Sequence, residues 1–155
     1  MNTLIRRTRA AAALVCTLLA LCACASKDVG TGLVNGRLAP CPKSPNCVSS
    51  DAVGEEHHVQ PYRLKANAGQ TWQGLQQVVL ARERTTLVSV DDSYLHIETR
   101  SAIFRFVDDT EFQLRADEGI IAVRSAARIG YSDFGVNRAR VESIREALRS
   151  RQLIE

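Results

Sequence analysis

The chain has 155 residues, with 20 basic and 17 acidic side chains and a formal net charge of +3. Its length fits one domain of ordinary size. A content of 45% apolar and 24% charged residues excludes the disordered and collagen-like classes.

The N-terminus has the pattern of a secretory signal peptide, in which a basic segment precedes an apolar run. Three arginines lie before the apolar run over residues 10–23. The run is shorter than the roughly 20 residues that a transmembrane helix needs. It ends in Leu21-Cys22-Ala23-Cys24, which resembles a bacterial lipobox. The resemblance implies that residues 1–23 are removed as a lipoprotein signal peptide and that Cys24 receives acyl chains such as palmitate.

The lipobox resemblance also implies a location. No acidic residue directly follows Cys24, a pattern that favours the inner leaflet of the bacterial outer membrane, with the domain facing the periplasm. The membrane partner is then the N-terminal lipid itself, because several acyl chains make a lasting anchor. The alternative is ordinary cleavage after Ala23 or Ala25, which leaves a soluble periplasmic protein.

The surplus positive charge lies in the signal peptide. Arg6, Arg7 and Arg9 are its only charged residues, so the mature chain keeps 17 basic and 17 acidic groups. The mature chain also lacks a cluster of Lys and Arg interleaved with aromatic residues. We therefore expect no nucleic-acid partner.

Two cysteines remain after processing, Cys41 and Cys47. An even pair in an oxidising compartment predicts a structural disulfide. A redox or metal pair is the alternative, but C-x5-C is not the thioredoxin-like C-x-x-C, and a zinc site needs two more ligands. We therefore predict no metal and no cofactor.

Residues 24–37 are small, polar and rich in glycine, and we expect a flexible tether followed by a single domain over residues 38–155. A helix over residues 68–84 is expected to begin at the N-cap Asn67. Alternating patterns then predict short strands over residues 87–90 and 94–100, around Phe104 and Phe106, around Phe112 and Leu114, and over 120–126, before a second helix over 136–151.

This element order predicts the fold class. Strands joined by tight turns pair antiparallel, because parallel pairs need long crossovers. Each helix has one apolar stripe, so both are expected on the same face of the sheet. The sequence thus predicts a two-layer α+β fold, an antiparallel sheet of short strands with two amphipathic helices on one face.

The candidate ligand-binding residues are concentrated late in the chain. The loop 130–135 leads into a helix, where backbone N–H groups and the helix dipole favour an anion. One interpretation is a site for a phosphate, a carboxylate or a sugar acid. The other is that the arginines pair with nearby acids and fix the loop. The candidates are Asp108, Asp109, Glu111, Arg124, Arg128, Ser132, Asp133, Asn137 and Arg138.

No catalytic signature is present, and we expect a protein that is not an enzyme. Ser132 lies in G-x-S-x-F, which lacks the second glycine of the hydrolase elbow. Asp108 and Glu111 are three residues apart on a strand, so they are expected on opposite faces. A hydrolase of an envelope ester or glycan, using Asp109 or Glu111 with His58 or Ser132, is the alternative.

Three segments together resemble a known family. They are CPKSPNCVSS at 41–50, DDTEF at 108–112 and RSAARIGYSDFGVNR at 124–138. The chain resembles, over about residues 38–150, the uncharacterised family called domain of unknown function 1499. The resemblance implies that these segments are the marks of the family, and we expect them to converge on one surface.

Together these patterns predict a lipid-anchored envelope protein that binds a small anionic ligand or a cell-wall component. A hydrolase and a purely structural or assembly lipoprotein are the alternatives.

Overall fold

The computed structural model describes residues 30–155. The signal peptide and Cys24 lie outside the described residues. The strands are β1 (Leu33–Val34), β2 (Arg37–Leu38), β3 (Cys47–Ser49), β4 (Tyr62–Arg63), β5 (Thr85–Val90), β6 (Tyr94–Arg100), β7 (Val107–Arg115) and β8 (Ile120–Ala127), and the helices are α2 (Ala68–Leu80) and α3 (Val136–Ser150).

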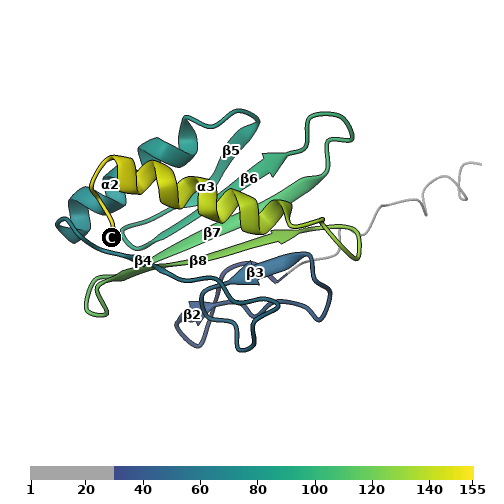
Figure 1. Ribbon diagram of the computed structural model, residues 1–155, viewed down its shortest axis with the longest axis horizontal. Helices are drawn as coiled ribbons and strands as arrows, with labels where there is room; N and C mark the ends of the chain where they lie inside the picture. Colours follow the sequence, from purple (N-terminus) through teal and green to yellow (C-terminus); the bar gives the residue numbers. More distant parts are fainter. Residues whose placement is uncertain (1–29) are drawn as a thin grey trace, which may run out of the picture.

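These elements form two layers. Six strands make one sheet in the order β3-β8-β7-β6-β5, with β4 also pairing with β8, and the pairings are antiparallel. Helices α2 and α3 lie beside each other across one face of this sheet (Figure 1). The predicted two-layer α+β fold is confirmed.

The hydrophobic core lies between the helices and the sheet. Helix α2 contributes Leu75 and Val79, α3 contributes Ile144 and Leu148, and β7 contributes Phe112. All five are fully buried. Every second side chain of a strand points away from the helices. We call the face of the sheet on which these side chains lie the outer face.

Helix α2 begins where the sequence predicts and ends earlier. The Asn67 side chain accepts hydrogen bonds from the N–H groups of Gly69, at 2.9 Å, and Gln70, at 3.4 Å. The helix ends at Leu80, four residues before the predicted end. The chain turns at Arg84, whose φ is 54°, and the β-branched Thr85 already belongs to β5. Helix α3 ends one residue before its predicted end.

Residues 30–37 differ from the expected tether. Strands β1 and β2 form a hairpin that contacts the outer face of the sheet. The Gly32 N–H donates to Glu111 at 2.5 Å, and the Gln113 side chain donates to the Gly36 carbonyl at 2.9 Å. Strands of two residues have no readable alternation, so the pattern did not indicate the hairpin.

The segment around Phe104 and Phe106 is a loop, although its alternation predicted a strand. The pairing of β6 with β7 ends at Arg100 and Val107. Arg105 between the two rings has a φ of 58°, which is outside the β region. Both rings are exposed, and they stack on each other with centroids 5.4 Å apart. Within residues 30–155, no helix is long and apolar enough to cross a membrane.

Candidate functional site

The sheet separates the predicted site residues into two groups. Consecutive residues of a strand point to opposite faces. Asp108 therefore lies on the helix side, where it bonds to Arg140 of α3, while Asp109 and Glu111 lie on the outer face with Arg124 of β8. The prediction that Asp108 and Glu111 point apart is confirmed. The family segments converge in part. Asp108 joins the helix-side network that also contains Asn46 and Asn137. Asp109 and Glu111 of the second segment lie on the outer face instead.

The outer face contains a completely buried ion pair. Arg124 donates to Glu111 at 2.7 Å, and both side chains have an exposed fraction of 0%. The other Glu111 oxygen accepts from the Tyr94 hydroxyl, at 2.6 Å, and from the Gly32 N–H, at 2.5 Å. Burial and the hydrogen bond to Glu111 raise the pKa of Tyr94, so its hydroxyl remains a donor. The Glu111 carboxylate is thus held by three donors.

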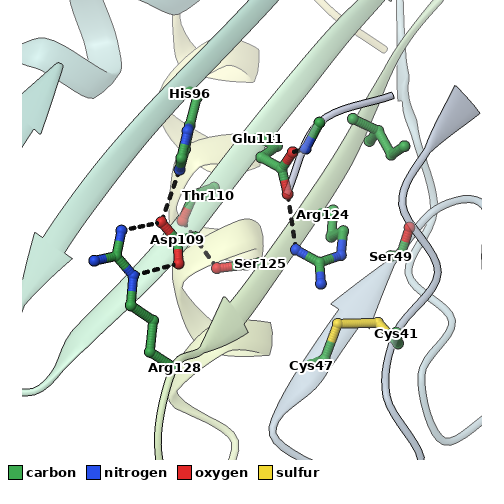
Figure 2. A network of polar contacts seen from close by, with 12 residues as sticks. Cys41, Cys47, Ser49, His96, Asp109, Thr110, Glu111, Arg124, Ser125 and Arg128 are labelled. Carbon is green, nitrogen blue, oxygen red and sulfur yellow. Dashed lines mark hydrogen bonds and ion pairs between the residues drawn. A yellow bond between two sulfur atoms is a disulfide. The ribbon is translucent and has the colours of Figure 1, made fainter. Parts of the chain in front are cut away.

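Asp109 is the centre of a second outer-face cluster. Its carboxylate is fully buried between His96, at 2.7 Å, and the Arg128 guanidinium, at 2.8 Å to each oxygen (Figure 2). Burial acts to raise the pKa of Asp109, but the hydrogen bonds from Arg128 and His96 outweigh it and lower the pKa to about 2. Arg128 also bonds to Glu98, so carboxylates of the protein already occupy its guanidinium.

On the helix side, a polar network connects β7 and β8 to α3. Arg140 donates to Asp108 at 2.5 Å, to Asn137 at 2.5 Å and to Ser125 at 2.9 Å. The Ser125 hydroxyl donates to Asn137 at 2.6 Å and lies 2.9 Å from the Thr110 hydroxyl. Burial raises the pKa of Asp108, against the lowering effect of Arg140.

In the loop before α3, the Asp133 carboxylate accepts hydrogen bonds from the backbone at the start of the helix. Asp133 accepts from the N–H groups of Gly135, at 3.1 Å, and Asn137, at 2.7 Å. These are backbone donors that we expected an external anion to use, so Asp133 already satisfies them. Arg138 donates to the carbonyls of His58, at 2.7 Å, and Glu56, at 2.8 Å, and so connects α3 to the loop before β4.

The residue pairs of the hydrolase alternative do not meet among the described residues. Asp109 bonds to His96 and Arg128. His58 contacts the Ala52 carbonyl at 3.2 Å, and the exposed Ser132 hydroxyl accepts from the Phe134 N–H. No hydrogen bond joins Asp109 or Glu111 to His58 or Ser132, so no observation favours this alternative.

The cysteine segment contains β3, which is an edge strand of the sheet. Cys41 and Cys47 form the predicted disulfide, with Cα atoms 5.7 Å apart. Within this loop, Asn46 donates to the Gly130 carbonyl at 2.8 Å, and its own carbonyl accepts from Asn137 at 3.1 Å. The first and third family segments therefore meet here. Residues 30–155 contain no group of three or more His, Cys, Asp or Glu side chains arranged to hold a metal ion.

Several contributors to these networks were not predicted, among them Arg140 and His96. Arg140 lies three residues after Asn137 and four before Ile144, so helical spacing places it on the same stripe and was a usable signal. His96 alternates with Leu95 and Ile97, a pattern typical of an exposed strand position, but it is 7% exposed. Its contact with Asp109 crosses from β6 to β7, and no local pattern shows which strands are neighbours.

The buried ion pair predicts a large mutational effect. In Glu111→Gln, the buried Arg124 guanidinium loses the Glu111 carboxylate, so we expect a loss of about 3–5 kcal/mol in the free energy of unfolding, measured by urea denaturation. Glu146→Gln is the control, because Glu146 forms a surface pair with Arg149 in which the two side chains are 71% and 48% exposed. Its expected loss is under about 1 kcal/mol. Equal losses would contradict the structural importance of the buried pair.

Asp109 predicts a pH dependence of stability. A carboxyl group with a lowered pKa stabilises the fold above its unfolded pKa, and this contribution disappears as the pH falls through the folded pKa. For Asp109 we expect about 2 kcal/mol, lost between about pH 4 and pH 2. The difference in unfolding free energy between the parent and Asp109→Asn should shrink over this range. The exposed Asp92→Asn should show no such change, and a constant difference for Asp109→Asn would refute the assignment.

One comparison with known proteins identifies a family for the chain. The model of the family described as "Protein of unknown function (DUF1499)" matches residues 37–148, which is most of the chain. No curated protein matches the chain. The three segments at 41–50, 108–112 and 124–138 all lie inside the match and pack around β8 in the structure. The chain therefore belongs to the DUF1499 family.

Proposed function

We propose that this protein is a lipid-anchored component of the bacterial cell envelope whose domain binds a small anionic ligand without catalysing a reaction. The observation that carries the proposal is an open groove lined by three arginines. It has a volume of about 520 Å³, within the range of small-molecule sites. The groove lies between the turn after α2, the end of β6 and the first turns of α3. Its lining residues are Arg82, Glu83, Arg84, Thr99, Val136, Ala139, Arg140 and Ser143.

The charge of the groove suits an anion. Three guanidinium groups line it together with one carboxylate, that of Glu83. Arg82 donates to the neutral Ser143 hydroxyl at 3.1 Å, so this contact leaves its charge uncompensated. Arg84 pairs with Glu83 only at the surface, where the side chains are 45% and 84% exposed. Guanidinium groups bind phosphates and carboxylates with paired hydrogen bonds.

Two of the residues predicted from the sequence position an arginine that lines this groove. Asp108 and Asn137 both bond to Arg140, which lines the groove, and so hold its guanidinium in one orientation. Such preorganisation lowers the entropic cost of binding. By contrast, Arg128 on the outer face is already bonded to Asp109 and Glu98. Arg140 is itself paired with Asp108, so Arg82 and Arg84 are the cations of the groove that we expect to bind the ligand. We therefore place the ligand in the groove and assign the outer-face cluster a structural role.

The anchor remains a proposal from the sequence. The basic segment, the apolar run and the lipobox-like Leu21-Cys22-Ala23-Cys24 support acylation of Cys24, and the absence of an acidic residue after it supports the outer membrane. A small anion of the periplasm, a phosphate or a sugar acid of the cell wall, would then be the class of ligand available to the groove.

The groove can be tested with defined probes. We expect inorganic phosphate or N-acetylmuramate to perturb the amide resonances of α3 and of residues 82–84 in an NMR titration. Arg82→Gln and Arg84→Gln should each weaken binding about tenfold, because a hydrogen bond to a charged group contributes about 1.5 kcal/mol or more. Arg63→Gln removes the same charge from an exposed position on β4, outside the groove, and should leave binding unchanged. No perturbation by either probe, or equal weakening in Arg63→Gln, would reject the groove.

The anchor has an independent test. Cys24→Ala should leave an uncleaved precursor and abolish labelling by radioactive palmitate in the bacterial host, because the acceptor thiol is gone. Cys22→Ala is the matched control, and it should keep both the label and the processing. An intact mass that corresponds to an unmodified chain beginning at Cys24 or Ser26 would show ordinary signal cleavage instead.

A further inference from the structure

One end of the domain presents apolar side chains to solvent. The loop between β6 and β7 and the loop between β8 and α3 both leave the sheet at this end, because Arg100 pairs with Val107 and Asp108 with Ala127 (Figure 1). Six large apolar residues in these two loops have exposed fractions from 48% to 96%. We call them the apolar end, and they are Ile103, Phe104, Phe106, Ile129, Tyr131 and Phe134.

Each of the two loops contains one residue other than glycine whose backbone is in the left-handed region, at or beside an exposed ring. Phe134 has a φ of 54° and is 96% exposed, so a bulky residue occupies the left-handed region with its ring in water. Arg105 has a φ of 58° between the stacked rings of Phe104 and Phe106. Neither feature contributes to the core. Strain and exposed aromatic surface together indicate a contact outside the domain.

The start of the described chain lies toward the same end. Gly36 bonds to Gln113, and Gly32 bonds to Glu111. From Gly36 back to Gly32, the chain therefore runs alongside β7 toward Val107, the first residue of that strand. Phe106 of the apolar end directly precedes β7. Five residues lie between Cys24 and Gly30, so six Cα–Cα steps join the two. At about 3.5 Å per step, these six steps span at most about 21 Å. An anchor at Cys24 would thus keep the domain close to the bilayer surface.

We propose that the apolar end inserts into the interfacial region of the bilayer that anchors the chain, an inference that rests on the proposed lipid anchor. Aromatic rings and short apolar side chains are the groups that partition into this region. The loop residues 101–106 and 129–135 contain two charged side chains, Arg105 and Asp133. Asp133 is turned inward to the backbone of α3, which leaves the Arg105 cation to face lipid phosphates.

The test places a reporter at each end of the domain. Phe134→Trp, Phe104→Trp and Asp117→Trp are made singly in the full chain, purified from envelopes and reconstituted into vesicles of phosphatidylethanolamine and phosphatidylglycerol with brominated acyl chains. Asp117 is the control, because it is exposed in the β7–β8 turn at the opposite end of the sheet. Trp72 is 5% exposed, and the parent chain supplies its background signal. All three positions are exposed, so the variants should fold.

We expect the brominated lipids to quench the added tryptophan at positions 134 and 104 at least about twofold more than at position 117, because only the first two reach the acyl chains. An intact mass of the same sample reports acylation separately. If the chain is acylated and the three positions are quenched equally, the inference is overturned while the anchor stands. If the chain is not acylated, the anchor proposal fails. The same comparison after mixing with vesicles then supports the apolar end through preferential quenching, or rejects it through equal quenching.

A second copy of this chain is the competing occupant of the apolar end. Sedimentation of the parent and of the double variant Phe104→Ser/Phe134→Ser in detergent distinguishes it. One oligomeric state for both agrees with the membrane contact. A parent dimer that the double variant converts to a monomer would overturn it, because the apolar end would then be a protein interface.

Discussion

The buried ion pair between Glu111 and Arg124 is the constraint on which the architecture depends. A buried carboxylate must be paired and hydrogen-bonded, since its desolvation is otherwise very costly. In this sheet the pair lies on the face that the helices do not cover. The second Glu111 oxygen therefore needs donors from elsewhere, and they come from Tyr94 on β6 and from the Gly32 backbone. The β1–β2 hairpin is thus part of the domain, although its own strands are too short to be stable alone.

Because side chains alternate along β7, its polar residues belong to two separate networks, one on each face of the sheet. Asp108 and Thr110 join the helix-side network, while Asp109 and Glu111 join the outer face. Adjacent residues of one family segment therefore serve different purposes. The outer-face acids fix neighbouring strands to each other, whereas Asp108 orients Arg140 at the groove. A cluster that is dense in sequence becomes two separate networks because a strand places consecutive side chains on opposite sides.

Most of the fold was readable from local patterns, and most of the networks were not. The caps, helical stripes and tight turns indicate both helices and the antiparallel order, because these signals depend on residues close in the chain. The alternation around Phe104 was misleading, since a loop tip with two exposed rings has the same spacing as a half-buried strand. The groove was also not predictable, because Arg82 and Arg140 approach it from different helices and turns.

The sequence by itself determined the class of fold, the disulfide partners and the family, and it predicts the export route. These depend on composition, on spacing within a few residues and on ordered motifs. Only the tertiary structure decided that Arg124 and Arg128 are occupied by Glu111 and Asp109, and that Arg140 lines an open groove. The physical reason is that pairing of charges depends on strand register and on helix packing. Both bring together residues that are far apart in the chain, and neither leaves a periodic trace in the sequence.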